Sequence, residues 1–143
     1  MNQLLFGEFA DGRKAVGLFA LRLVTGAAFI LHGWPKIQQA FNWMGPDASV
    51  PGFLQAAAAL AEFGGGIALI LGLLTPVAAL AIAGTMVTAI GMVHLSQGHP
   101  FVNPKGPSYE LAAIYLVVTV TLALTGPGKL SLDALLFGKK RTP

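Results

Sequence analysis

The stretch Phe53–Leu74, FLQAAAALAEFGGGIALILGLL, decides the fold of this protein because Glu62 is the one charged residue within an otherwise apolar run. The run is longer than the roughly 17 residues that a helix needs to cross a bilayer. A charged side chain at the centre of a membrane costs roughly 2.5–3.5 kcal/mol when nothing offsets it. The stretch therefore predicts a membrane-spanning helix whose carboxylate faces the protein interior.

Three further apolar runs, Val16–Leu31, Val77–Leu95 and Leu111–Thr125, are separated by segments rich in proline and glycine, and the first contains Arg22. The chain of 143 residues is 55% hydrophobic and 10% charged, whereas soluble domains carry about 25% charged residues. The sequence therefore predicts an all-α protein, an integral membrane four-helix antiparallel bundle that forms a single domain over residues 1–143.

Local signals place the ends of the helices. Trp34-Pro35 is expected to end the first helix, Thr75 to cap the third with Pro76 at its first position, and Ser131 to cap a short helix at the membrane surface. Turn residues mark the other boundaries. The expected helices run over about 15–34, 53–74, 76–95 and 109–125, followed by an interfacial segment at about 131–137.

Lysine and arginine predict the orientation. Arg13, Lys14, Lys129 and the tail at 139–141 lie on the side of the two termini, and only Lys36 and Lys105 lie in the opposite loops. The positive-inside rule therefore favours cytoplasmic termini in a bacterial-type inner membrane, with external loops at 35–52 and 96–108. The start of the chain lacks a basic segment and a cleavage site typical of a signal peptide, so we expect the first helix to be retained.

Polar residues recur at helical spacing inside three of the predicted helices. On the first helix they fall within an arc of roughly 80°. Small residues accompany them on the second helix and would allow close approach. The three stripes consist of Arg22, Thr25, Phe29, His32 and Lys36; Gln55, Ala58, Ala59, Glu62, Gly65 and Gly66; and Glu110, Ala113, Val117 and Thr121.

Buried charges in a bilayer require partners, and the depth along each helix suggests which ones. At about 1.5 Å per residue, the expected structural ion pair is Arg22 with Glu62, while Glu110 pairs with Lys36 or His32. In one interpretation these pairs only fix the helix register. In another, His32, Lys36, Glu62 and Glu110 form a pocket that binds a polar headgroup or cofactor or passes protons. Arg22 could instead extend to the inner interface.

Histidine raises the question of haem or metal. His32 and His94 lie at similar depths, so haem between two imidazoles is an alternative, although no supporting motif accompanies them. His94, His99 and Glu110 form a weak metal-ligand set, and we expect no metal site. The chain has no cysteine, which excludes thiolate ligation and disulfide exchange within it.

The sequence resembles the DoxX family from about Leu21 to Asp133. The resemblance rests on an ordered series of motifs: Arg22-x3-Gly26, His32-Gly33-x2-Lys36, Glu62-Phe63-Gly64-Gly65-Gly66, Leu71-Gly72-Leu73-Leu74-Thr75, His94, Glu110-Leu111 and Gly126-Pro127-Gly128-Lys129-Leu130-Ser131-Leu132-Asp133. Pro76 departs from the family pattern, which often has a basic residue after the threonine. The resemblance implies four transmembrane helices.

The resemblance also implies a function. The family is similar to small subunits of quinone-linked oxidases and thiosulfate:quinone oxidoreductases, which makes quinone the expected cofactor and His32, Lys36, Glu62 and Glu110 the expected binding residues. The basic residues form no surface suited to nucleic acid. The expected partners are the bilayer and other redox subunits, and self-association stays open.

Three functions therefore compete at this point. The leading one is a membrane subunit of a quinone-linked oxidoreductase assembly that binds quinone or relays protons in a polar pocket inside the bundle and anchors redox partners. Since the chain has no cofactor-binding motif of its own, we do not expect it to catalyse alone. The alternatives are a non-catalytic scaffold or assembly factor and a small proton-coupled transporter.

Overall fold

The computed structural model describes residues 9–138, and this part of the chain contains helices and no strand. Two predictions from the sequence concern residues outside it: the absence of a signal peptide at the start of the chain and the position of the basic tail Lys139, Lys140 and Arg141. The helices are α2 (Gly12–Gln38), α3 (Gly52–Leu71), α4 (Thr75–Thr88), the π-helix η1 (Ala89–Leu95), α5 (Glu110–Thr125) and α6 (Leu132–Phe137).

The helices have the length and surface of a membrane protein. Gly12–Gln38, Gly52–Leu71 and the continuous Thr75–Leu95 are each long and apolar enough to cross a membrane, and α5 is a shorter apolar helix of 16 residues. Large apolar side chains face outward, among them Leu124, which is 82% exposed. Such an exposed apolar surface is stable in lipid and not in water. The chain is therefore a multi-pass membrane protein.

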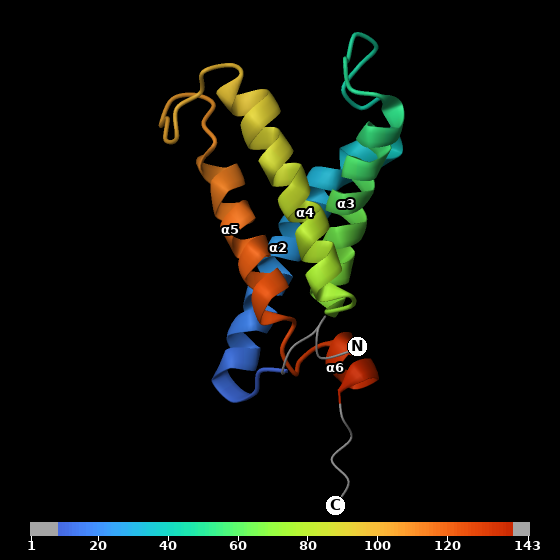
Figure 1. The fold of residues 1–143 in the computed structure, drawn as a ribbon, viewed down its shortest axis with the longest axis vertical. Coiled ribbons are helices and arrows are strands. Elements are labelled where there is room, and N and C mark those ends of the chain that lie inside the picture. Colours follow the sequence, from blue (N-terminus) through green and yellow to red (C-terminus); the bar gives the residue numbers. More distant parts are fainter. Residues whose placement is uncertain (1–8, 139–143) are drawn as a thin grey trace, which may run out of the picture.

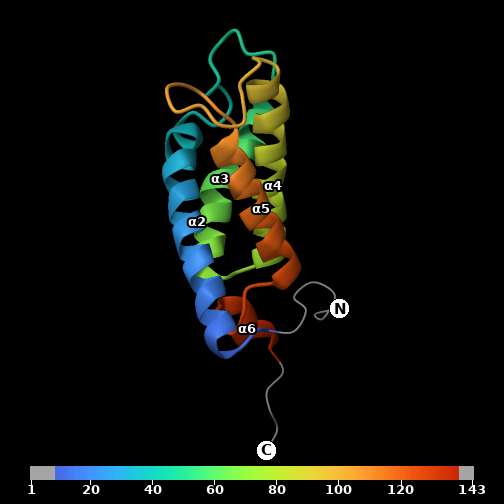
Figure 2. The same ribbon diagram turned by 90° about the vertical axis from the view of Figure 1, so that its left-hand side faces the viewer.

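Helices α2 to α5 lie side by side (Figures 1 and 2). The most extensive contact joins α2 to α3, and α4 packs against both α3 and α5. The α3–α4 turn and α6 lie at one end of the molecule, and the two long loops lie at the other (Figure 1). The buried apolar core includes Phe29, Leu69, Ile82 and Leu122.

Glycines set the approach of α2 to α3. A methyl group added at Gly66 would lie 2.7 Å from the carbonyl oxygen of Gly26, and one added at Gly33 would lie 2.5 Å from the backbone nitrogen of Phe63. Both obstacles are backbone atoms, which cannot move aside as a side chain can. This close packing, typical of small residues in membrane helices, fixes the register of the two helices.

The register decides which charges meet. Because Gly26 faces Gly66 and Gly33 faces Phe63, Arg22 lies beside the last turn of α3, whereas Glu62 lies beside the last turn of α2. The expected Arg22–Glu62 ion pair is therefore wrong. The carboxylate of Glu62 pairs with Lys36 instead.

Arg22 has a structural role at the opposite end of α3. Its side chain is fully buried, and its Nη1 donates to the carbonyl of Leu69 at 3.1 Å while Nη2 donates to the carbonyl of Leu130. Asp133 adds a Coulombic attraction. A guanidinium at a helix C-terminus also interacts favourably with the helix dipole. Arg22 thus ties α2 to the end of α3 and to the segment before α6.

The α3–α4 turn depends on Asp133, a residue that is distant in sequence. Gly72 and Leu74 both have positive φ angles, 66° and 47°, and Asp133 accepts hydrogen bonds from the backbone N–H groups of Leu74 at 2.7 Å and Thr75 at 2.9 Å. Thr75 was expected to cap α4, but it is the first residue of the helix. The carboxylate of Asp133 therefore satisfies two backbone N–H groups at the start of α4 that have no partner within the helix.

Two other helix ends also differ from the sequence prediction. Helix α2 continues through Pro35 to Gln38, since a proline removes only one backbone hydrogen bond and a helix can continue past it. Helix α3 ends at Leu71 because Gly72 takes the left-handed conformation there. The expected cap at Ser131 is confirmed, with its hydroxyl accepting from the N–H of Ala134 at 3.1 Å.

Helix α5 turns a different face inward from the one predicted. Ala112, Thr119 and Leu122 are buried, whereas Val117 is exposed. Thr121 is also exposed, and its hydroxyl donates to the carbonyl of Val117 at 2.8 Å. A threonine that bonds its own helix in this way needs no partner in the interior, so its polarity does not mark the buried face.

Replacing Gly66 with leucine should destabilise the protein, because the side chain must displace the backbone of α2. Overpacking of this kind costs typically 1–3 kcal/mol. The matched control is Gly84→Ala in α4, where nothing lies within 4 Å of the added methyl group. Thermal unfolding in detergent, monitored by size-exclusion chromatography, should show a lower midpoint for Gly66→Leu than for wild type. The midpoint of the control should not fall below that of wild type. Equal midpoints would contradict the assigned helix contact.

Replacing Asp133 with alanine should destabilise the α3–α4 turn, because the N–H groups of Leu74 and Thr75 lose their acceptor. Each unsatisfied buried donor costs roughly 1–3 kcal/mol. Asp133→Asn keeps one side-chain oxygen and should lose less. In the same measurement, the midpoint of unfolding should be highest for wild type, lower for Asp133→Asn and lowest for Asp133→Ala. An alanine variant as stable as wild type would rule out this role.

A candidate polar cavity at the loop end

Side chains of α2, α3, α4, η1 and α5, together with the loop before α5, line a cavity of about 270 Å³. Its wall combines charged, aromatic and apolar side chains. The lining residues are Phe29, His32, Lys36, Glu62, Met86, Ala89, His94, Ser108, Leu111, Ala112 and Tyr115. Cavities of this kind, mostly apolar with a few convergent polar groups, are the usual form of small-molecule sites.

The ion pair of Lys36 and Glu62 forms the polar centre of the cavity wall. Lys36 Nζ lies 2.6 Å from each carboxylate oxygen, and the side chains of Lys36 and Glu62 are 25% and 5% exposed. Lys36 lies in the last turn of α2. This turn exists because the helix continues beyond Pro35. The pairing offsets the desolvation of both charges.

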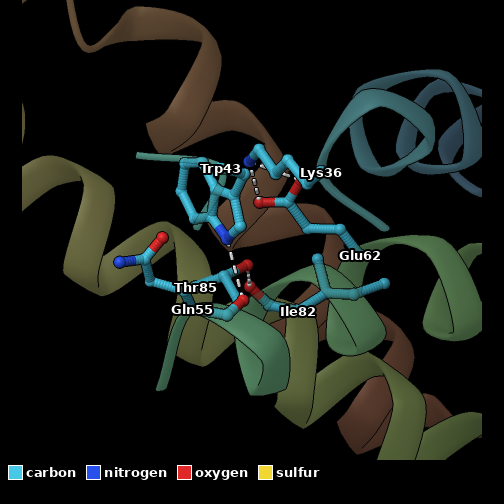
Figure 3. A network of polar contacts seen from close by, with 6 residues as sticks. All are labelled: Lys36, Trp43, Gln55, Glu62, Ile82 and Thr85. Carbon is cyan, nitrogen blue, oxygen red and sulfur yellow. Dashed lines mark hydrogen bonds and ion pairs between the residues drawn. The ribbon is translucent and has the colours of Figure 1, made fainter. Parts of the chain in front are cut away.

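A network from the first loop covers this ion pair (Figure 3). The ring of Trp43 lies 4.6 Å from Lys36 Nζ, in cation–π geometry. Trp43 Nε1 donates to the carbonyl of Gln55 at 2.8 Å, while the buried Gln55 side chain accepts from the N–H of Met44 and donates to the carbonyl of Val50. Gln55 thus holds the loop over one side of Lys36.

Aromatic rings form the opposite side. The ring of Tyr115 lies 5.0 Å from that of Phe29 and 6.5 Å from that of His32, both in edge-to-face arrangement. Such pairs are more stable than face-to-face stacking. Phe29 and His32 come from the stripe that was predicted on the first helix, whereas Tyr115 was not among the predicted site residues. The inward face of α5 brings Tyr115 to the cavity, and sequence periodicity did not reveal that face.

The π-helix brings His94 to the cavity. Ala89 and His94 both line it although they are five residues apart, a spacing that in an α-helix would place them about 140° apart. In η1 the hydrogen bonds run from i to i+5 and bring residues at this spacing close to one face. No pattern in the sequence indicates this change from the α-helical to the π-helical period.

The structure brings three of the four predicted binding residues together. His32, Lys36 and Glu62 line the cavity, whereas Glu110 does not and, among residues 9–138, forms no ion pair with Lys36 or His32. Its expected pairing is therefore wrong. Lys36 already contacts both oxygens of Glu62, and Glu110 lies in the first turn of α5, where the helix dipole stabilises an acidic side chain.

The remaining candidates concern haem and metal. His32 and His94, the pair considered for haem, both line the cavity. His94 Nδ1 lies 3.1 Å from His99 Nδ1. In the described part of the chain, no group of three or more His, Cys, Asp or Glu side chains is placed to hold a metal ion.

The arrangement suits a ligand with a polar ring. Lys36 and the imidazole of His32 can donate hydrogen bonds to carbonyl oxygens, as can the hydroxyls of Ser108 and Tyr115. Phe29, Met86 and Leu111 offer apolar contacts to the rest of the ring. These residues fit the headgroup of a quinone, which has two carbonyl oxygens on an apolar ring.

Two comparisons with known proteins found similar sequences. The DoxX family model matches residues 17–95. The chain is 36% identical over 131 residues to the "Inner membrane protein YqjF" of Escherichia coli, covering 85% of this chain and 92% of that protein. It is 33% identical over 132 residues to the "Putative oxidoreductase CatD" of Bacillus subtilis, covering 87% and 91%. No solved structure matches the chain.

The matched region includes most of α2 and all of α3, α4 and η1, and thus the Lys36–Glu62 ion pair and His94. With a family model over more than half of the chain and relatives aligned over nearly their full length, this protein belongs to the DoxX family.

Proposed function

We propose that this protein is a membrane subunit of an oxidoreductase assembly, and that it binds a quinone headgroup in the cavity of Lys36 and Glu62. The observation that carries the proposal is the buried ion pair in a cavity wall, where only one side of Lys36 is covered by Trp43. An ion pair that served only to fix helix register would not need an adjoining cavity. The relative CatD carries the word oxidoreductase in its name.

Residues of this chain would hold the ring in a defined orientation. Lys36 and His32 lie one turn apart on α2 and would donate to one carbonyl, while Ser108 and Tyr115 come from the α5 side of the cavity. Phe29 and Tyr115 would contact the ring face. A quinone accepts two electrons and two protons when it is reduced, so the site must supply protons.

Glu62 and Lys36 would hold a proton next to the ligand. Lys36 Nζ lies 2.6 Å from the carboxylate, and burial of Glu62 keeps bulk water away from the pair. The electrons would come from a redox partner, because the chain has no cysteine and no motif for a redox cofactor. Anchoring that partner is the second part of the proposed role.

We further propose that α2 to α5 form an antiparallel four-helix bundle across the membrane with both termini in the cytoplasm. The positive-inside rule supports this orientation. Arg13, Lys14 and Lys129 lie at the end of the molecule with α6, and Lys105 lies in a loop at the other end. The cavity would then open toward the outer face.

The orientation can be tested by cysteine labelling, since the chain has no cysteine of its own. Lys105→Cys in the loop should react with a membrane-impermeant maleimide in intact cells, because that loop faces outward. Lys129→Cys should react only after lysis. The opposite pattern would reverse the proposed orientation.

Quinone binding can be tested with the paired variant Lys36→Met/Glu62→Leu. Replacing both partners with apolar residues of similar volume is often neutral for stability, whereas removing one leaves an uncompensated buried charge. Loss of a charged hydrogen bond to the ligand is worth roughly 1.5–3 kcal/mol, about a tenfold or larger loss of affinity. The affinity can be measured by titrating a short-chain ubiquinone into protein in lipid nanodiscs in a calorimeter. The heat from empty nanodiscs is subtracted.

The control is Lys105→Met, which removes one exposed positive charge outside the cavity and should bind like wild type. Wild-type protein that binds no quinone above empty discs would refute the proposed function. A folded double variant with unchanged affinity would exclude the ion pair from the site and favour a scaffold role, in which the charges are purely structural.

A further inference from the structure

His99 gives the cavity a connection to the outer loop. His94 lines the cavity, and its Nδ1 lies 3.1 Å from Nδ1 of His99, with the ring centroids 5.3 Å apart. His99 does not line the cavity and lies half-buried in the loop between η1 and α5. The two imidazoles therefore form a contact between the cavity and the loop.

Backbone geometry fixes this contact. Gly98 has a φ angle of 68° and donates its N–H to the carbonyl of Leu95, while His99 donates its N–H to the carbonyl of His94. These two bonds are those of a Schellman motif, which commonly brings the residue after the glycine against the residue five positions earlier. A pair of apolar side chains is usual at these two positions. Here both positions are histidine.

The hydrogen bond between two Nδ1 atoms also constrains the protons. One nitrogen must carry a proton and donate, and the other must accept. Since Nδ1 of His94 is engaged by His99, Nε2 is the ring nitrogen left to reach a ligand in the cavity. Imidazole is the side chain that gains and loses protons near neutral pH.

We propose that His99 and His94 relay protons from the outer loop to the ligand in the cavity, an inference that rests on the quinone function proposed above. When the redox partner supplies an electron to the ligand, His94 would give up its Nε2 proton and take the Nδ1 proton of His99. His99 would then take a proton from the bulk solution at its own Nε2. One proton enters and one leaves, and tautomer exchange in both rings prepares the next transfer.

Other titratable groups surround the relay. His32 and Lys36 of α2, Glu62 of α3 and Tyr115 of α5 line the same cavity. Glu110 begins α5, and Lys105 lies in the same loop as His99. Those in the cavity can hold a delivered proton, whereas His99 lies outside the cavity lining and hydrogen-bonds to His94. His99 therefore supplies protons to His94 and does not itself contact the ligand.

The variant His99→Leu tests whether His99 transfers protons or only stabilises the turn. Leucine at this position restores the apolar contact of an ordinary Schellman motif, so the turn and the position of His94 should persist. Gln97→Leu in the same turn is the matched control, because Gln97 is exposed and does not line the cavity. The two substitutions add the same apolar side chain to one loop.

Protein-film voltammetry can measure the relay in protein reconstituted with a short-chain ubiquinone, since the electrode supplies both electrons and the protein must supply the protons. The charge passed per protein reports bound quinone, and the scan-rate dependence of the wave reports the proton-coupled rate. His99→Leu should pass the same charge as wild type but at a rate at least tenfold lower at pH 7, consistent with the usual range for positioned acid–base groups. Added imidazole should restore the rate, and Gln97→Leu should match wild type.

Zinc ions provide a second measurement of the same pair. Two nitrogen ligands at 2.0–2.1 Å from a tetrahedral zinc ion lie about 3.3 Å apart, close to the 3.1 Å between the two Nδ1 atoms. Micromolar Zn²⁺ should therefore slow the wild-type wave without reducing its charge, and His99→Leu should be insensitive.

The outcomes distinguish the two proposals. A wild-type film that holds no quinone above lipid alone refutes the quinone function and the relay with it. Equal charge and equal rates in wild type and His99→Leu overturn the relay and leave quinone binding intact. A lower rate in His99→Leu that imidazole does not restore also overturns it, because a purely structural effect would then explain the loss.

Discussion

A charge buried among membrane helices must find its partner within the protein, because the bilayer offers no water to solvate it. Helices α2 and α3 meet this constraint at both ends of their contact. At one end Arg22 binds backbone carbonyls and is attracted by Asp133, and at the other Lys36 binds Glu62. The glycine contacts between the two helices set the register that makes both arrangements fit.

The two ends of the molecule differ in what surrounds these charges. Around Arg22 the structure is tightly packed. Asp133 of α6 caps α4, and Gly72 has no side chain that would block the guanidinium. Around Lys36 and Glu62 the helices diverge and leave a cavity. The first end therefore serves stability, and the second is the part of the described chain where a ligand has space beside a charged pair.

The cavity joins residues with separate chemical roles. Lys36 and Glu62 supply charge, Phe29 and Tyr115 supply apolar ring surfaces, and His94 connects to His99 at the loop. A purely structural ion pair would be equally stable if the surrounding space were filled with apolar side chains. The combination of a charged pair, an open volume and an imidazole pair is what distinguishes the proposed redox role from that of a scaffold.

The sequence by itself determined the helical class, the membrane environment, the cap at Ser131 and the inward stripes of α2 and α3, because apolar length and helical period are local properties. It also predicted His32, Lys36 and Glu62 as binding residues, and all three line the cavity. It did not determine which charges pair: helix depth counted from the ends placed Arg22 near Glu62, but the glycine contacts shift the register so that Lys36 meets Glu62.

Tertiary structure also decided the inward face of α5, the capping of α4 by Asp133 and the position of His94. Each depends on contacts between segments distant in sequence or on a local change from α to π geometry, neither of which alters the apolar pattern. The sequence thus specifies which segments cross the membrane and that their charged side chains need partners. Only the packing of the helices specifies which face of α5 is buried and what each buried side chain meets.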